Sequence, residues 1–157
     1  GAALALVLPT GAYDAKRMAN AGNNITTLRP VFVASYLTES GLDVSTKISY
    51  SINRKNSDTN YQSGQYLHAD FNVGTRVAPS WQVGLQGYLI HQTTDDKLNG
   101  VKVGSDGNRT RVFAFGPGVR WQASPTAPSV EFRYRKETGA RNHTQGNVVW
   151  LKAVWAL

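Results

Sequence analysis

Polar and apolar residues alternate with a period of two through most of this 157-residue chain. In residues 42–52 the even positions hold Leu, Val, Thr, Ile, Tyr and Ile, whereas the odd positions hold Asp, Ser, Lys, Ser and Ser. Successive side chains of a β-strand point to opposite faces, so this pattern predicts strands with one apolar and one polar face. No stretch of useful length has the period of a helix. The alternation therefore predicts an all-β fold.

Eight segments of this kind follow one another along the chain. They are residues 2–8, 25–37, 42–52, 65–77, 81–92, 109–121, 129–136 and 147–157. Short turns at 38–41, 78–80 and 125–128 alternate with long polar loops at 9–24, 53–64, 93–108 and 137–146. Short turns on one rim and long loops on the other are typical of outer-membrane barrels. We therefore expect an antiparallel up-and-down transmembrane β-barrel, with eight strands in this chain, as a single domain over residues 1–157.

Composition narrows the alternatives. With 41% hydrophobic and 17% charged residues, the chain does not resemble a disordered protein. No run of about 18 apolar residues is present, which excludes a helix that spans a membrane. The chain has no cysteine, so disulfides and thiolate metal sites are excluded. The three histidines lack the spacing of metal ligands, and we expect neither a metal nor a cofactor.

The alternation alone leaves open whether the apolar face points outward to lipid or inward to a core. A soluble barrel turns its apolar face inward. Aromatic residues near the ends of the expected strands favour a membrane protein, because such barrels carry aromatic girdles: Tyr36, Tyr50, Trp81, Trp121 and Trp155. The alternation up to Leu157 also resembles the C-terminal assembly signal of outer-membrane barrels. A soluble or periplasmic β-barrel that binds an apolar ligand is the alternative.

The polar face carries more basic than acidic residues, and we expect these side chains to line the lumen. The set comprises Arg29, Asp43, Lys47, Asp70, Arg76, Arg120, Glu131, Arg133, Arg135 and Lys152. A positive lumen would favour neutral or anionic solutes, such as aromatic carboxylates, over cations. The same residues could instead form ion pairs that hold adjacent strands together. Several of the arginines are expected near the short-turn rim, where Glu131 is the obvious acidic partner.

His68 and Asp70 lie two residues apart on the same expected face. They could form a pH-sensitive gate or a binding pair, because histidine titrates near neutrality, or simply a hydrogen bond between strands. Other charged residues lie in the long loops and could form a plug, tether a ligand or be ordinary solvated turn residues. These are Asp14, Arg17, Asp58, Asp95, Asp96, Glu137 and Arg141.

Two further classes of function receive little support. The net charge of +7 would suit nucleic acid, but the basic residues are scattered singly, so we expect no nucleic-acid partner. A lipid-modifying barrel enzyme is a second alternative, with His91 on the lipid-facing side near the long-loop rim. No serine lies within obvious reach of His91, and no nucleophile, base and acid can be assembled. We therefore expect that the protein is not an enzyme.

Five stretches, spread over nearly the whole chain, carry a family resemblance. They are PTGAYD at 9–14 with Arg17, Asn20, Gly22 and Asn24; NSDTNYQSG at 56–64 with His68 and Asp70; Gly87 and Tyr88 with Gln92, Thr93 and Asp95; RVFAFGP at 111–117; and Arg133 and Tyr134 with ETGARN at 137–142, Gly146, Trp150 and Leu151. In this order they resemble the outer-membrane proteins grouped as the MetA-pathway of phenol degradation family. Asn60, where that family more often has Asp, and residues 143–145 depart from the pattern.

The resemblance implies a location in the bacterial outer membrane and a porin-like or transporter-like barrel. It implies a role in the uptake of small hydrophobic or aromatic compounds. The expected partners are outer-membrane lipid and a small aromatic or anionic solute. The resemblance also implies a longer barrel of about twelve strands, of which this chain would form the C-terminal portion.

Overall fold

The computed structural model describes residues 1–155, in which all regular structure consists of strands joined by turns and loops. Eight strands form the main sheet: β1 (Ala2–Val7), β2 (Thr27–Leu37), β3 (Asp43–Asn53), β5 (Tyr66–Ala78), β6 (Trp81–Gln92), β9 (Arg111–Gln122), β10 (Ser129–Arg141) and β11 (Asn147–Val154). A small second sheet contains β4 (Tyr61–Gln62), β7 (Lys97–Leu98) and β8 (Val101–Lys102). In the described residues there is no helix long and apolar enough to cross a membrane.

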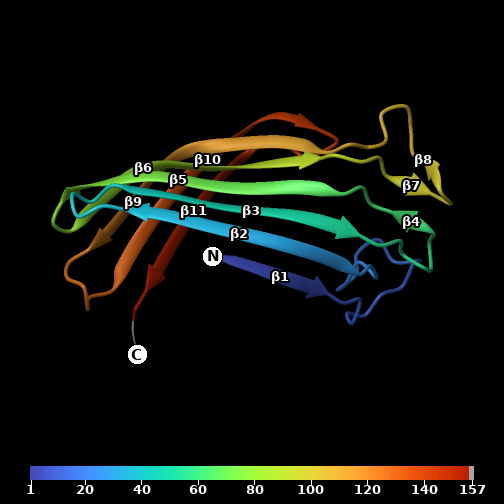
Figure 1. Cartoon of the computed structure of the whole chain (residues 1–157), viewed down its shortest axis with the longest axis horizontal. Helices are drawn as coiled ribbons and strands as arrows, with labels where there is room; N and C mark the ends of the chain where they lie inside the picture. Colours follow the sequence, from blue (N-terminus) through green and yellow to red (C-terminus); the bar gives the residue numbers. More distant parts are fainter. Residues whose placement is uncertain (156–157) are drawn as a thin grey trace.

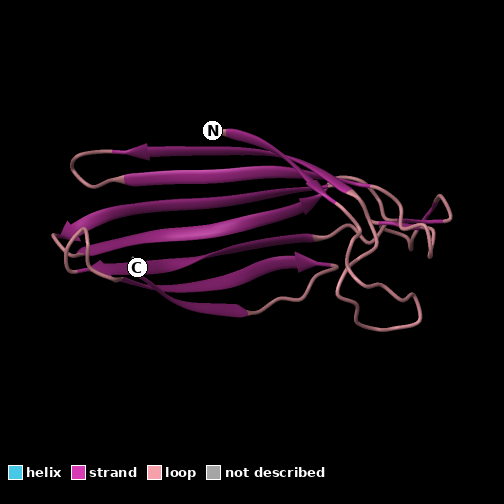
Figure 2. Ribbon diagram, turned by 90° about the horizontal axis from the view of Figure 1, so that it is seen from below, coloured by secondary structure: helices cyan, strands magenta, loops and turns pink. Residues whose placement is uncertain are grey.

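The main sheet has the strand order β1-β2-β3-β5-β6-β9-β10-β11, and every neighbouring pair is antiparallel. Strands therefore pair in the order in which they occur in the chain, once the short loop strands are set aside. Figures 1 and 2 show these strands side by side, with short turns at one end and long loops at the other. The expected all-β antiparallel fold with eight long strands is confirmed.

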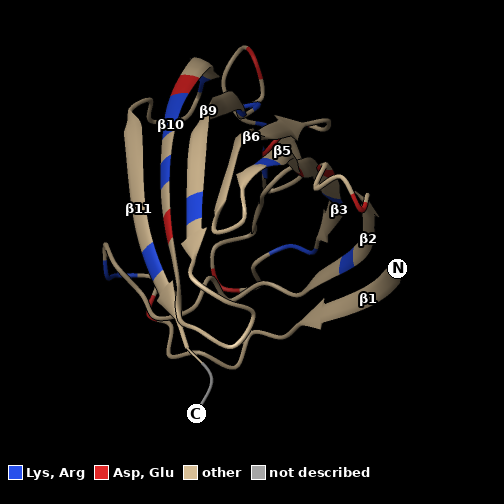
Figure 3. Cartoon of the chain, turned by 90° about the vertical axis from the view of Figure 1, so that its left-hand side faces the viewer, with Lys and Arg blue, Asp and Glu red and all other residues tan. Residues whose placement is uncertain are grey.

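The sheet is curled but does not close on itself. Figure 3, which looks along the strands, shows an arc with β1 and β11 at its two open edges. In the described residues β1 pairs only with β2, and β11 pairs only with β10. The closed barrel expected from the sequence is therefore not seen in the described residues. Alternation within a strand does not specify whether the first strand pairs with the last, so the sequence pattern could not determine closure. Leu157, at the end of the expected assembly signal, lies outside the described residues.

Contacts between strands that are not neighbours show to which side the sheet curls. The Tyr88 hydroxyl on β6 donates to the Glu137 carboxylate on β10. The guanidinium carbon of Arg135, also on β10, lies 5.7 Å from the centroid of the Tyr88 ring. These contacts reach over β9, and a cavity on the same face is lined both by Lys47 on β3 and by Arg133 on β10, which only a sheet curled toward this face can bring together. The polar face is therefore concave.

The apolar side chains occupy the opposite, convex face, where they are exposed. Along β9, Phe113 and Phe115 are 39% and 47% exposed, whereas Val112 and Ala114 between them are 0% exposed. Exposed apolar residues continue across the convex face of the other strands: Ile48 at 39%, Val73 at 47%, Leu85 at 57%, Phe132 at 44% and Leu151 at 74%. This orientation agrees with the sequence-based expectation of an apolar exterior and a polar interior.

The observed elements differ from the expected ones mainly in two of the long loops and at the end of β10. Strands β4, β7 and β8 lie in the segments expected as loops at 53–64 and 93–108. Strand β10 continues to Arg141, five residues past the expected end at 136, through an irregularity between Thr138 and Arg141. Residues 137–141 are mostly polar, so hydrophobic alternation does not reveal that the strand continues. Gly139 has a φ of 62°, which favours glycine at this irregularity.

Candidate functional site

The candidate site is the concave face of the main sheet, because the charged residues expected in the lumen all lie there. Register partners place Arg76 beside Gln82, Gln82 beside Arg120, Arg120 beside Glu131, and Glu131 beside Lys152 in one row across five strands. A second row pairs Lys47 with Asp70. Arg29, His68, Arg133 and Arg135 share this face through the contacts described below. Figure 3 shows the basic positions of β9, β10 and β11 in blue on one arm of the arc.

Asp70 connects two of the expected residues. Lys47 Nζ lies 3.2 Å from Asp70 Oδ2, and His68 Nε2 lies 3.6 Å from Asp70 Oδ1. Lys47 is on β3, whereas His68 and Asp70 are on β5, so the acid joins two adjacent strands. The ring of His68 also meets the ring of Tyr88 edge to face, with centroids 6.1 Å apart. His68 therefore has an acidic neighbour, Asp70, and an aromatic neighbour, Tyr88. Its role as a pH-sensitive gate stays a prediction.

Arg29 is held by neutral partners. Its Nε donates to the Ser51 hydroxyl at 2.9 Å, and its Nη2 donates to the Tyr66 hydroxyl at 3.2 Å. Strand β3 lies between Arg29 on β2 and Tyr66 on β5, so this contact reaches over one strand on the concave face. Neither partner carries a negative charge, so Arg29 contributes positive charge to the concave face.

Ion pairing neutralises only part of the basic set. Lys47 pairs with Asp70, and Arg133 pairs with Glu131. In the described part of the chain, the other basic members of the set have no carboxylate oxygen within 4.0 Å: Arg29, Arg76, Arg120, Arg135 and Lys152. The two interpretations left open by the sequence therefore both apply in part. Some charges link strands, and the remainder leave the concave face positive.

Three further residues of the concave face belong to the site but were not in the expected set: Gln86, Tyr88 and Glu137. Gln86 on β6 accepts hydrogen bonds from Arg135, with Nε at 3.2 Å and Nη2 at 2.8 Å. Glu137 was expected in a loop but lies in β10, where it is 9% exposed and accepts from Tyr88. Its Oε2 also accepts from the Gly146 amide at 2.8 Å. The alternation along β6 puts Gln86 and Tyr88 on the same face as the polar residues. Neither was in the expected set, because that set was chosen by charge.

A hollow lies in the concave face over a row of glycines. Gly74, Gly84 and Gly118 are register partners on β5, β6 and β9. Because these residues have no side chains, a cavity of about 370 Å³ opens above them. Its lining includes Asp43, Asn72, Gln82, Gln86, Arg120, Glu131, Arg133 and Lys152. The hollow therefore brings five of the expected lumen residues together with three amide side chains that were not in the expected set.

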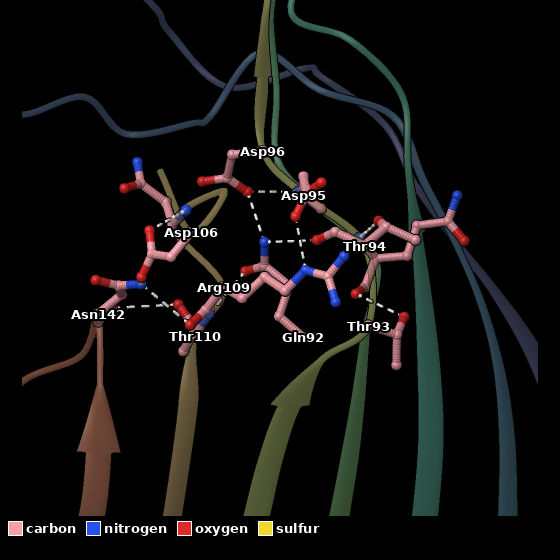
Figure 4. A network of polar contacts seen from close by, with 12 residues as sticks. Gln92, Thr93, Thr94, Asp95, Asp96, Asp106, Arg109, Thr110 and Asn142 are labelled. Atoms are coloured by element: carbon pink, nitrogen blue, oxygen red, sulfur yellow. Dashed lines mark hydrogen bonds and ion pairs between the residues drawn. The ribbon is translucent and has the colours of Figure 1, made fainter. Parts of the chain in front are cut away.

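The long loops are joined to one another at the rim (Figure 4). Asp96 is 8% exposed, and its Oδ1 accepts from the Gly64 amide at 2.7 Å and from Gln92 Nε2 at 2.8 Å. The Tyr61 hydroxyl donates to the same carboxylate. Two segments far apart in the sequence thus meet at Asp96, which explains why the small sheet of β4, β7 and β8 forms beyond the strand ends.

Two other rim carboxylates are held by basic or amide side chains. Arg109 Nε lies 2.6 Å from Asp95 Oδ1, and this hydrogen bond holds the pKa of Asp95 below its usual value. Asn142 Nδ2 donates to Asp106 Oδ2 at 2.8 Å, and this hydrogen bond is the main cause of a lowered pKa at Asp106. Of the charged loop residues singled out in the sequence, Asp96 and Arg141 thus connect separate loops. Asp95 pairs with Arg109 within one connection, and Asp14 pairs locally with Arg17.

The positions of His91 and of the carboxylates bear on a metal or catalytic centre. No three His, Asp or Glu side chains come together as metal ligands in the described residues. His91 lies on the convex face, between Leu67 on β5 and Arg111 on β9 in register. Within residues 1–155 no hydroxyl or carboxylate hydrogen-bonds to its ring. The expectation that the protein is not an enzyme stays a prediction.

The fold and the site define an all-β protein: a curled antiparallel wall with an exposed apolar outer face and a polar, basic inner face. The chain belongs to the family described as "Putative MetA-pathway of phenol degradation", which matches residues 1–153. This match confirms the resemblance carried by the sequence motifs, and it connects the protein with the metabolism or uptake of aromatic compounds. No curated protein and no solved structure matches the chain.

Proposed function

We propose that this protein is a channel or transporter of the bacterial outer membrane that passes small aromatic or other hydrophobic compounds. In this proposal neutral and anionic solutes pass more readily than cations, and no chemical reaction is catalysed. The observation that carries the proposal is the division between the faces of the sheet. The convex face exposes a broad apolar surface, and the concave face collects basic side chains around a hollow.

The convex face has the composition expected of a surface in contact with lipid. Val73, Leu85 and Phe132 are 47%, 57% and 44% exposed, and they belong to a continuous apolar band across the strands. A soluble protein rarely exposes so large an apolar area. Trp81 and Trp121 are register partners at the short-turn ends of β6 and β9, where a barrel carries its aromatic girdle.

The alternative of a soluble barrel with an apolar ligand inside fits the geometry less well. That alternative requires the apolar face to be concave and the charged face to be convex. The polar side chains are on the concave side instead, because those of Lys47 on β3 and Arg133 on β10 line one cavity. An apolar ligand inside the sheet would therefore face polar side chains over most of the concave surface.

A membrane location adds a requirement at the edges of the sheet. Strands β1 and β11 each have one edge with no pairing partner in the described residues. Unpaired backbone amides and carbonyls are costly in hydrocarbon, so strands span membranes only in closed barrels. The proposal therefore includes further pairing partners for both edges, as in the barrel of about twelve strands that the resemblance implies.

Reversal potentials in planar bilayers test the proposed selectivity. The whole protein is inserted, and the current is measured across a salt gradient. We expect a preference for anions, because Arg76 and Arg120 line the concave wall without carboxylate partners in the described residues. Replacing both (Arg76→Gln with Arg120→Gln) should shift the reversal potential toward the cation-selective side.

The control removes the same kind of charge from the other face. Lys136 lies on the convex face, beside Phe115 in register. The single variant Lys136→Gln should leave the reversal potential unchanged, and so should the double variant that adds Lys16→Gln in a long loop. A cation preference in the unaltered protein that the arginine replacements do not change would contradict the proposal.

A further inference from the structure

We propose that the glycine hollow is a binding site for a planar aromatic carboxylate, with a preference for a ring that carries a hydroxyl group opposite the carboxylate. The inference rests on the proposed passage of aromatic solutes and names the solute class and the place where it binds. The hollow is the cavity of about 370 Å³ above Gly74, Gly84 and Gly118.

The floor of the hollow is flat because backbone rather than side chains forms it. A Cβ on Gly84 would lie 2.6 Å from the Val73 carbonyl oxygen and 2.7 Å from Gly74 Cα, so β5 and β6 approach too closely for a side chain there. At Gly118 the nearest atoms to such a carbon belong to the Gln86 side chain, the closest at 3.4 Å. There is therefore room for a carbon atom over Gly118 in ordinary van der Waals contact with Gln86, and a flat ring can lie against this floor.

The short-turn side of the hollow supplies positive charge for a carboxylate. Arg120 and Lys152 flank Glu131 in register, but the Glu131 carboxylate pairs with Arg133. Arg120 donates to the neutral Gln122 amide at 2.8 Å. Guanidinium groups bind carboxylates with two parallel hydrogen bonds.

Asp43, the other acidic residue of the hollow, lies on a different strand from Arg120 and Lys152. Asp43 on β3 is the register partner of Gly74, whereas Arg120 and Lys152 lie on β9 and β11. Two strands, β5 and β6, separate β3 from β9 in the sheet. A bound carboxylate is therefore placed on the β9 side of the floor, where basic side chains outnumber the one acid, Glu131.

The long-loop side of the hollow offers an unused hydrogen-bond donor. Gln86 is 3% exposed, and its Oε1 already accepts from Arg135. Its Nε2 has no hydrogen-bond partner among the described residues, although buried polar groups are nearly always paired. That nitrogen lies 3.4 Å from the place where a Cβ on Gly118 would be, so an oxygen atom seated over Gly118 would be within reach.

The two sides are separated by a distance that suits a disubstituted ring. Gln86 Nε2 lies next to Gly118, and the Arg120 guanidinium reaches the side chain of Gln122, which is four positions from Gly118 along β9. Four residues of a strand span about 13 Å, part of which the side chains take up. A benzene ring with a carboxylate and a hydroxyl at opposite positions, plus a hydrogen bond of about 2.8 Å at each end, fills that distance.

Calorimetric titration of the whole protein in detergent tests this site with defined probes. The probes are 4-hydroxybenzoate, benzoate, cyclohexanecarboxylate and benzylamine. We expect 4-hydroxybenzoate to bind at least threefold more tightly than benzoate, because only it can use the free donor of Gln86. Cyclohexanecarboxylate, which is not planar, should bind at least fivefold more weakly than benzoate, and benzylamine should not bind.

Three substitutions separate the parts of the site. Gly118→Leu fills the hollow and should weaken 4-hydroxybenzoate at least tenfold, whereas the control Ser35→Leu, on the concave face of β2 outside the hollow, should not. Gln86→Leu should abolish the preference for the hydroxyl group. Arg120→Gln should weaken both aromatic carboxylates without changing the fold, and it provides the test if Gly118→Leu does not fold.

Two outcomes overturn the inference. One is equal binding of benzoate and cyclohexanecarboxylate, and the other is unchanged binding in Gly118→Leu or, where that variant does not fold, in Arg120→Gln. Flux of benzoate into vesicles is measured in parallel. Flux without binding at the hollow rejects this inference and leaves the proposed function intact. Binding at the hollow without any flux rejects the proposed function and leaves the site intact.

Discussion

At the scale of single residues, backbone conformation accounts for much of the loop sequence. Asn60, Asn108 and Asn142 have φ values of 55°, 49° and 49°, and Gly107 has a φ of 70°. Asparagine and glycine adopt this left-handed region with the least strain. Asp, which the family resemblance implies at position 60, also tolerates this conformation. The departure therefore preserves the loop backbone, whose Asn60 carbonyl accepts from the Asn99 amide at 3.1 Å.

The rim carboxylates give the loops a predicted pH dependence. The hydrogen bond from Arg109 lowers the pKa of Asp95, and that from Asn142 lowers the pKa of Asp106. A pKa lowered in the folded state stabilises the fold above the ordinary carboxyl pKa, and this stabilisation is lost as the pH falls through the lowered value. Amide exchange in residues 93–110, corrected for its intrinsic pH dependence, should therefore speed up below about pH 4.

Two variants distinguish this cause from general acid unfolding. The double variant Asp95→Asn with Asp106→Asn should lack the step, because neither position can change its charge. The variant Asp58→Asn, which alters a loop carboxylate without an arginine partner in the described residues, should keep it. An identical step in the double variant, or equal acceleration in β6, would show that the rim pairs are not responsible.

The charged residues of the site were predictable, whereas several of their partners were not. Arg29, Lys47 and Asp70 could be assigned to one face because the period of a strand fixes that face directly. Glu137 could not, because its strand continues through polar residues. The hydrogen bond between Glu137 and Tyr88 depends on the register of β6, β9 and β10, which no local pattern encodes.

At the scale of elements, the eight long strands were predictable because each repeats the same alternation several times. The two-residue strands β4, β7 and β8 were not, since they are too short to show a period. They form because Asp96 joins the loops through Gly64 and Tyr61. Closure was not predictable either, because it depends on contacts between the two ends of the strand order.

Strand β5 allows a matched test of the two faces. Val73 is on the convex face and 47% exposed, and the adjacent Asn72 lines the concave hollow. If lipid surrounds Val73, the substitution Val73→Arg should destabilise the protein by about 2–4 kcal/mol, because a charged side chain would enter hydrocarbon. The free energy of unfolding can be measured by reversible refolding into lipid vesicles.

The neighbouring position serves as the control. Asn72→Arg introduces the same side chain at the same depth but on the polar face, and it should cost clearly less. Equal losses of stability for Val73→Arg and Asn72→Arg would contradict the assignment of the convex face to lipid. A smaller loss at Val73 would point to a soluble wall, on which an exposed arginine is tolerated.

At the scale of the whole molecule, the proposed function requires that the curled sheet separate two environments. The register aligns residues from five strands into rows, so that single charges on separate strands become a basic wall and single glycines become a hollow. Neither feature belongs to one segment of the sequence. The hollow has a function only if water and solutes occupy the concave side while another medium covers the convex side.

Spin labelling measures that separation most directly, and the chain is suited to it because it contains no cysteine. Single cysteines are placed at positions 44 to 48 of β3 in the whole protein and labelled in lipid vesicles. Collision rates are then measured with oxygen, which concentrates in lipid, and with a charged nickel complex, which stays in water. Val44 and Ile48 lie on the convex face, and Ser45 and Lys47 on the concave face.

We predict that both collision rates alternate with a period of two residues, and that the two alternations have opposite phases. Labels at Val44 and Ile48 should collide mainly with oxygen, and labels at Ser45 and Lys47 mainly with the nickel complex. The phase follows from the exposed apolar convex face, on which Val44 and Ile48 are 40% and 39% exposed. High nickel accessibility at all of these positions, or the reverse phase, would contradict the claim that this sheet is the wall of a membrane channel.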